Sequence, residues 1–208
     1  MNRLLVLAVL LLTLSVETPA FSADFLKGLN AYRVGDYTTA MHQWKPLAEN
    51  RGFSSYFYSK RDVINAQYNL GVMYANGRGV PKDDETAVKW YNLAAKQGLT
   101  SAQYSLGVMY ANGRGVPKDD ETAVRWYTLA AKQGLTSAQY NLGFAYYNGE
   151  GVPKHFVHAS MWWHIAASSG YENAIQNRNI LAGMMTPANT STAHKLADEC
   201  VRNEYKGC

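Results

Sequence analysis

A repeat of 36 residues constrains the fold of this chain more than any other feature. Residues 66–101 and 102–137 differ at only three positions, and a looser third copy occupies 138–173 with Gly143 and Pro153 in register. Such self-similarity is typical of repeat proteins, in which one unit cannot bury its apolar face alone and stacks against its neighbours.

Each copy predicts two helices joined by a turn. In the first helix, Ala102, Leu106 and Tyr110 recur at a spacing of four and lie on one face. The glycine- and proline-containing segment 113–117 then ends this helix. Repeated helix pairs therefore predict an all-α fold, an α/α solenoid.

The second helix has its own start signal and apolar stripe. Asp119 or Asp120 is the expected N-cap, and Gly134 is the expected glycine at the end of the helix. The residues expected on the stripe are Ala123, Trp126, Ala130 and Ala131.

One glycine recurs inside every first helix, as Gly71, Gly107 and Gly143. A helical glycine costs about 1 kcal/mol relative to alanine. Its recurrence at one register indicates a packing purpose, in which the missing Cβ lets a neighbouring helix approach closely.

The repeats extend into a single domain over 23–208. A diverged helix pair occupies about 24–52, and 174–208 is interpreted as a C-terminal cap in which Thr186 and Pro187 begin the last helix. Pro46 falls inside the second helix of the diverged pair and is expected to kink it.

An insertion at 53–65 interrupts the period. Insertions in repeat proteins lie on one face, often the binding face, so this segment is a candidate for partner contact. The alternative is an extra helical turn, or a plug over the core of the first repeat. The insertion is rich in aromatic residues, namely Phe53, Tyr56, Phe57 and Tyr58.

The repeat resembles the Sel-one-like (SLR) family, a relative of tetratricopeptide repeats. The resemblance implies right-handed stacks of helix pairs that scaffold protein–protein contacts, often in exported bacterial proteins. Some cysteine-rich secreted relatives carry β-lactamase activity, but this chain lacks their cysteine pair in each repeat. The matching residues in one copy are Ala102, Leu106, Gly107, Tyr110, Gly113, Gly115, Val116, Pro117, Asp119, Ala123, Trp126, Ala130, Ala131 and Gly134.

The N-terminal segment 1–22 predicts a secretory signal peptide. Asn2 and Arg3 precede an apolar run shorter than a membrane span, and small residues follow it. Cleavage is expected after Ser22, with cleavage after Ala20 as the alternative. We therefore expect a periplasmic or secreted protein with no membrane span after removal of the signal.

The sequence offers no catalytic motif. No serine is followed three residues later by lysine, and the HExxH, GxSxG and phosphate-loop patterns do not occur. We therefore expect a non-enzymatic, monomeric scaffold for a protein or peptide partner in the cell envelope. The alternatives are a cell-wall-related hydrolase such as a weak β-lactamase, and a secreted host-interaction factor.

Three histidines of the third copy pose a metal hypothesis. His155 and His158 lie three residues apart on one predicted helix, but the offset to His164 spoils convergence. All three replace surface positions of the preceding copy. We expect no metal and no cofactor.

The two cysteines predict a disulfide. Cys200 and Cys208 lie close together near the C-terminus, and an even pair in an exported protein favours a structural bridge. A redox pair would require the tighter CxxC spacing.

A partner is expected on the concave face formed by the first helices, where aromatic and asparagine side chains recur. The net charge of +4, without a ladder of basic residues on this face, argues against nucleic acid. The alternatives are that the tyrosines pack between repeats and that the asparagines cap helix ends. The candidate residues are Tyr68, Val72, Asn76, Tyr104, Val108, Asn112, Tyr140, Phe144, Tyr147 and Asn148.

Overall fold

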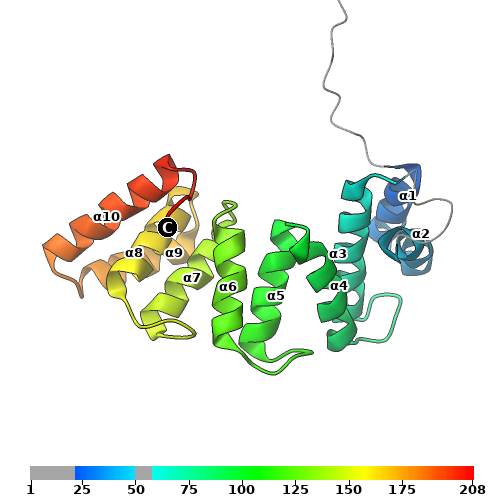
Figure 1. Cartoon of the computed structure of the whole chain (residues 1–208), viewed down its shortest axis with the longest axis horizontal. Helices are drawn as coiled ribbons and strands as arrows, with labels where there is room; N and C mark the ends of the chain where they lie inside the picture. The colour runs from blue at the N-terminus through cyan, green and yellow to red at the C-terminus, as the bar shows by residue number, and fades with distance from the viewer. Residues whose placement is uncertain (1–21, 50–57) are drawn as a thin grey trace, which may run out of the picture.

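The computed structural model describes residues 22–49 and 58–208, and all regular structure in them is helical. Successive helix pairs form a curved stack with α1 and α2 at one end and α10 at the other (Figure 1). The expected all-α, α/α solenoid is confirmed. The helices are α1 (Ala23–Arg33), α2 (Tyr37–Glu49), α3 (Lys60–Asn76), α4 (Asp84–Lys96), α5 (Thr100–Asn112), α6 (Asp120–Ala131), α7 (Thr136–Asn148), α8 (Phe156–Ser168), α9 (Glu172–Ala182) and α10 (Pro187–Arg202).

Two sequence predictions fall wholly or partly outside the described residues. The predicted signal segment, 1–22, lies outside them except for Ser22, which caps α1. Of the insertion 53–65, residues 53–57 also lie outside them, whereas 60–65 form the first turns of α3.

Side-chain caps fix where the second helices begin. Asp83 and Asp119 accept the backbone N–H of the residue three positions later at 2.9 Å, which leaves Asp119 as the N-cap. His155 takes the same place in the third copy and accepts the N–H of His158 at 3.2 Å. The cap geometry therefore recurs even where the residue type changes.

The recurring glycine of each first helix receives an aromatic ring from the second helix. A Cβ on Gly107 would lie 2.5 Å from Cδ1 of Tyr127, and one on Gly143 would lie 2.5 Å from Cδ1 of Trp163. These distances are too short for any real Cβ, so only glycine permits the ring to lie flat on the helix. The close approach predicted from the sequence is therefore made by a ring.

Buried glutamines join one pair to the next. Gln103 is 5% exposed, donates to the carbonyl of Ala95 at 3.3 Å, and accepts from Nε2 of Gln133 at 2.7 Å. Gln67 accepts from Gln97 at 2.8 Å in the same way one repeat earlier. Buried amides of this kind stabilise a fold only when their partners are in place, so they fix the register between pairs.

The turn after each first helix packs directly on the preceding pair. A Cβ on Gly115 would lie 2.2 Å from the carbonyl oxygen of Asp84, and one on Gly151 would lie 2.2 Å from that of Asp120. The two turns therefore meet the start of the preceding second helix in the same way.

The C-terminal segment closes the stack. Both α9 and α10 pack on α8, and Thr186 caps α10 with Pro187 in its first turn, as predicted. A disulfide joins Cys200 to Cys208, and Tyr205 packs against the core cluster of the second and third repeats. The bridge therefore holds the tail against this core.

Within 22–49 and 58–208, the structure has no helix that combines the length and the apolarity needed to cross a membrane.

We predict that Gly107→Ala lowers the free energy of unfolding by about 1–2 kcal/mol. Overpacking against Tyr127 costs about 1–3 kcal/mol, and the better helix propensity of alanine returns ~1 kcal/mol. Urea unfolding followed by circular dichroism measures the change.

Gly183→Ala is the matched control, because Gly183 has a helical φ and its added Cβ would meet only a carbonyl oxygen at 3.4 Å. Equal stability of Gly107→Ala and the wild type would contradict the ring-on-glycine account.

We also predict that reducing the Cys200–Cys208 bridge raises hydrogen exchange along α10. Closing so short a loop contributes about 2–3 kcal/mol in the loop-entropy model. Exchange measured with and without reductant tests this, and Cys208→Ser is the control, since reductant should then change nothing. Unchanged exchange in the reduced wild type would refute a stabilising bridge.

Candidate functional site

The three candidate tyrosines of the first helices belong largely to the packing between helices. All three are half-buried. The ring of Tyr68 lies 5.7 Å from that of Tyr91, and the ring of Tyr104 lies 5.9 Å from that of Tyr127. Tyr140 lies 6.4 Å from the ring of Trp163 in the same way. Each tyrosine therefore presents only part of its ring to a partner.

The candidate asparagines behave differently in the third repeat. Asn76 and Asn112 donate to the carbonyls of Val72 and Val108 at 2.8 Å, which is the helix-end capping considered as the alternative. Asn148 instead donates to Oε1 of Glu150 at 3.1 Å. The side-chain amides of Asn76 and Asn112 are thus hydrogen-bonded within their own helices.

An aromatic cluster distinguishes the third repeat. Phe144 stands where the earlier copies have Val72 and Val108, and it is 40% exposed. Its ring lies 6.2 Å from Tyr140 and 6.5 Å from Tyr147. The structure therefore brings these three candidate residues together on one surface, which we call the Phe144 surface.

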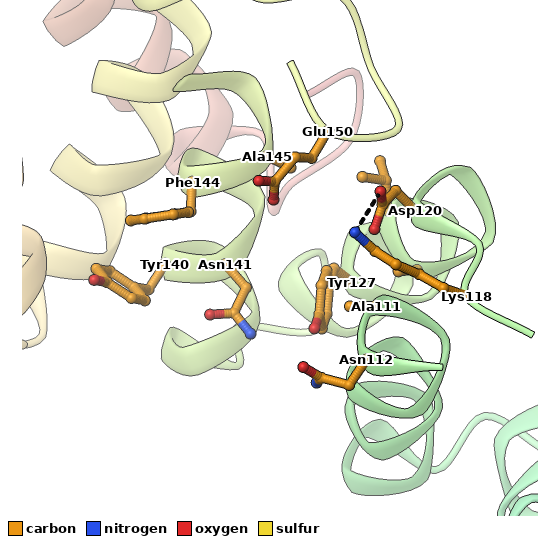
Figure 2. Close-up of a pocket in the computed structure, with 12 residues that line it drawn as sticks. Ala111, Asn112, Lys118, Asp120, Tyr127, Tyr140, Asn141, Phe144, Ala145 and Glu150 are labelled. Carbon is orange, nitrogen blue, oxygen red and sulfur yellow. Dashed lines mark ion pairs between the residues drawn. The ribbon is translucent and has the colours of Figure 1, made fainter. Parts of the chain in front are cut away.

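A pocket of about 370 Å³ adjoins the Phe144 surface between α5, α6 and α7 (Figure 2). Its floor is apolar and aromatic, and its rim carries one lysine and two carboxylates. The lining residues are Ala111, Asn112, Lys118, Asp120, Ala123, Val124, Tyr127, Tyr140, Asn141, Phe144, Ala145 and Glu150.

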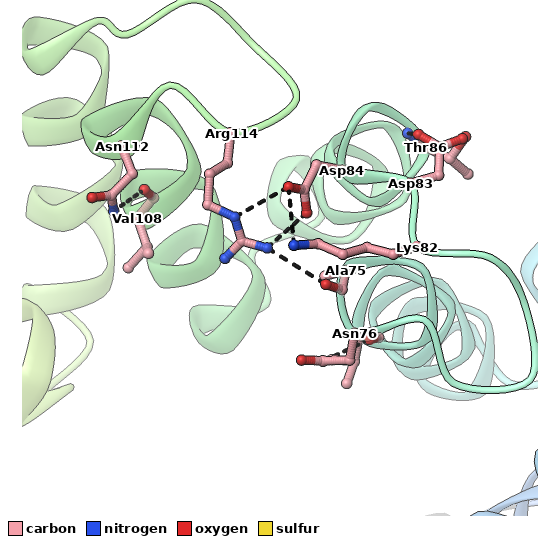
Figure 3. A network of polar contacts seen from close by, with 10 residues as sticks. Ala75, Asn76, Lys82, Asp83, Asp84, Thr86, Val108, Asn112 and Arg114 are labelled. Carbon is pink, nitrogen blue, oxygen red and sulfur yellow. Dashed lines mark hydrogen bonds and ion pairs between the residues drawn. The ribbon is translucent and has the colours of Figure 1, made fainter.

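The equivalent place one repeat earlier is occupied by Arg114 (Figure 3). Its guanidinium donates to both carboxylate oxygens of Asp84, through Nη2 at 2.7 Å and Nε at 3.2 Å, and Nη2 also lies 3.5 Å from the carbonyl oxygen of Ala75. These hydrogen bonds hold the pKa of the Asp84 carboxyl below its ordinary value. Arg114 therefore bridges two helix pairs.

Glu150 replaces this arginine at the pocket and cannot make the same bridge. Asp120, the counterpart of Asp84, pairs with Lys118 at 3.1 Å, whereas the corresponding Lys82–Asp84 distance is 3.8 Å. Burial raises the pKa of Tyr127 to about 12, and the charges of Asp120 and Glu150 act in the same direction. The negative charges of both carboxylates therefore help to raise the pKa of the Tyr127 hydroxyl at the pocket floor.

The histidines do not converge on one point. His155 is engaged as a helix cap with its ring 4.2 Å from that of His158, while His164 lies beside His194 with ring centroids 4.5 Å apart. Burial, and to a lesser extent His155, lowers the pKa of His158. Among the described residues, no three His, Cys, Asp or Glu side chains are grouped to hold a metal ion.

Sequence reasoning missed the pocket and its polar rim. Of the lining residues, the sequence predicts Asn112, Tyr140 and Phe144 as candidates, whereas it predicts Asp120 only as a helix cap and gives no role to Glu150. The signal available in the sequence is that Glu150 stands where the two earlier copies have an arginine, Arg78 and Arg114.

Solved structures that resemble this chain include two repeat proteins. A Sel1 repeat protein from Oxalobacter formigenes is 43% identical, with 56% of this chain and 87% of that one covered and a TM-score of 0.52. The protein c5321, described as a protective antigen present in uropathogenic Escherichia coli strains and displaying an SLR fold, is 26% identical with a TM-score of 0.64. That match covers 87% of this chain and 42% of c5321. No curated protein matches the chain.

A family model also matches the chain three times in succession. The Sel1 repeat model matches residues 64–99, 100–135 and 136–171, which together make up just over half of the sequence. Each match spans one pair of a first and a second helix, and the first match begins inside α3. The chain belongs to the Sel1 repeat family.

Proposed function

We propose that this chain is an exported scaffold that binds a protein or peptide partner through the Phe144 surface and the adjoining pocket. Sel1 repeats support a role in protein–protein interaction. The observation that carries the proposal for this chain is the aromatic cluster of the third repeat, in which the exposed Phe144 replaces the valine of the two earlier copies.

The chemistry of the Phe144 surface suits a peptide. Rigid aromatic side chains contribute large contact area at little cost in conformational entropy, and they are enriched among the residues that dominate binding energy. Phe144 is one of the large hydrophobic side chains that stays exposed, and it lies directly beside the pocket. A partner side chain could enter the pocket while its neighbours lie on the rings.

Export is supported by two features. The Cys200–Cys208 bridge suits an oxidising compartment, and the first residues have the pattern of a signal peptide. We propose a periplasmic or secreted location and a monomeric scaffold.

The contacts of Ser22 favour cleavage after Ala20 over cleavage after Ser22. Its side chain accepts the N–H of Phe25 at 3.3 Å, and its backbone N–H donates to Oδ2 of the buried Asp62 at 3.2 Å. Cleavage after Ser22 would remove the cap of α1 and leave Asp62 with one partner fewer. Loss of such a cap typically costs about 1 kcal/mol.

We predict that Phe144→Val weakens binding of the partner by at least about fivefold, the loss expected when a central aromatic contact is truncated. The variant should fold normally, because valine occupies this position in the two preceding repeats. A photo-crosslinking residue at position 144 first identifies the partner from envelope extract, and calorimetry then measures its affinity.

Leu93 supplies the control for both steps. It is 46% exposed on α4, away from the Phe144 surface. A crosslinker at Leu93 should capture nothing that competes with the partner, and Leu93→Ala should leave the affinity unchanged. Equal crosslinking at both positions, or full affinity in Phe144→Val, would reject this surface.

We predict that the full chain, expressed in Escherichia coli, is recovered from the periplasm with Phe21 as its first residue and no free thiols. Fractionation, intact mass and thiol titration test this. A first residue of Ala23 would retain export but refute the Ser22 argument. A full-length chain in the cytoplasm would refute export.

A further inference from the structure

The two junctions between the three regular repeats are nearly the same surface. We call them the α3/α4–α5 junction and the α5/α6–α7 junction. Of the twelve pocket-lining positions, eight carry the same residue in both junctions. Four positions differ. The α3/α4–α5 junction has Ser105, Val108, Met109 and Arg114, where the α5/α6–α7 junction has Asn141, Phe144, Ala145 and Glu150, respectively.

In the α3/α4–α5 junction, the group that is bound is the guanidinium of the chain's own Arg114. The Arg114 guanidinium binds Asp84 through two nitrogens, which is the paired geometry that arginine favours with a carboxylate. It also lies near the carbonyl of Ala75 (Figure 3), and its charge acts on Tyr91, the ring that covers Gly71. A carboxylate and a helix-end carbonyl thus bind one guanidinium, whose charge also acts on a nearby tyrosine.

The α5/α6–α7 junction keeps these groups. Asp120, Ala111 and Tyr127 stand where Asp84, Ala75 and Tyr91 stand one repeat earlier. In the turns that carry residues 114 and 150, a Cβ on the following glycine would lie 2.2 Å from a helix-start carbonyl oxygen in both cases, so the two turns pack in the same way. Residue 150 therefore leaves the backbone from the same place as Arg114, but as a glutamate it brings a second negative charge in place of the cation.

Two substitutions open the space that the arginine would fill. Ala145 replaces the buried Met109 and removes side-chain volume from the wall, and Glu150 turns to Asn148 of its own repeat. The remaining pocket of about 370 Å³ has two carboxylates and a single lysine on its rim (Figure 2).

We propose that this pocket receives the guanidinium group of an arginine side chain supplied by the protein partner. The inference rests on the proposed function and names the group that the partner contributes. The incoming arginine takes the place of Arg114: it pairs with Asp120 through two nitrogens and points toward the carbonyl of Ala111. Glu150 adds attraction for the cation, and the neighbouring residues of the partner lie on the Phe144 surface.

Lys118 yields this position when the arginine of the partner binds. Its counterpart Lys82 lies 3.8 Å from Asp84 while Arg114 makes the two shorter bonds. The side chain of Lys118 is 60% exposed, so it can move to the longer distance that Lys82 keeps from Asp84. An arginine can then bind Asp120. Arginine is favoured over lysine because its planar fork makes paired bonds that an ammonium cannot make.

The test uses the whole mature chain and N-acetyl-arginine methylamide as the probe, followed by two-dimensional NMR of backbone amides. We expect saturable shifts confined to α5, α6 and α7, with an affinity on the order of millimolar for so small a ligand. N-acetyl-citrulline methylamide, which is neutral and nearly the same shape, should bind at least about tenfold more weakly, as should the lysine analogue.

Three variants locate the site. Asp120→Asn should weaken binding of the arginine probe at least tenfold, and Glu150→Arg should abolish it, because the chain then fills its own pocket. Asp84→Asn is the matched control and should leave binding unchanged. The amide spectrum of each variant reports whether it is folded.

Equal binding of the arginine, citrulline and lysine probes would overturn the proposal, as would full affinity in folded Asp120→Asn. So would shifts that map to the α3/α4–α5 junction. If these results appear while crosslinking at Phe144 still captures a partner, the arginine inference fails and the proposed function stands. If crosslinking fails as well, both are refuted.

Discussion

The structure depends on one contact, an aromatic ring of each second helix lying flat on a glycine of the first. Tyr91, Tyr127 and Trp163 make this contact in the three regular repeats, and Trp44 makes it on Gly28 in the diverged pair. Because no side chain separates the helices there, the ring fixes both their distance and their rotation. Each pair is thus a nearly rigid unit of the same shape, and stacking such units produces the curved solenoid in Figure 1.

A rigid unit repeated with little change leaves few places where binding specificity can arise. The glutamine contacts and the turn glycines join the pairs in the same way at successive junctions. Four side chains then decide whether a junction is filled by the chain itself or left open. In the α3/α4–α5 junction Arg114 closes the space, and in the α5/α6–α7 junction Glu150 does not. The binding proposal follows from this contrast between two otherwise equal surfaces.

The sequence predicted the architecture because its signals are local and repeated. The glycine in each first helix, the capping aspartates and the Thr186–Pro187 helix start all depend on neighbours within a few residues. The identity of the ring on the glycine was not predicted. The period predicts Trp126 on the apolar stripe, but Trp126 is only half-buried, whereas Tyr127 is 7% exposed and covers Gly107. Two adjacent aromatic residues cannot be told apart by period alone, because the direction of approach is set by the partner helix.

The candidate site was predicted only in part for a related reason. Tyr140, Phe144 and Tyr147 do gather on one surface, but Asn76 and Asn112 are bonded within their own helices. The pocket lies between repeats, so it depends on which residues of consecutive copies meet across a junction. Arg114 pairs with Asp84 across one junction, whereas Glu150 makes no such pair with Asp120 across the next. This difference is visible only once the helix pairs are stacked.

The central claim is that these four positions alone convert a filled junction into an arginine site. The direct measurement is the number of arginine-probe sites per chain after Ser105→Asn, Val108→Phe, Met109→Ala and Arg114→Glu are introduced together. The wild type should bind one equivalent and the folded fourfold variant two, with new shifts in α3, α4 and α5. A folded variant that still binds one equivalent, or a wild type that binds none, would contradict the account.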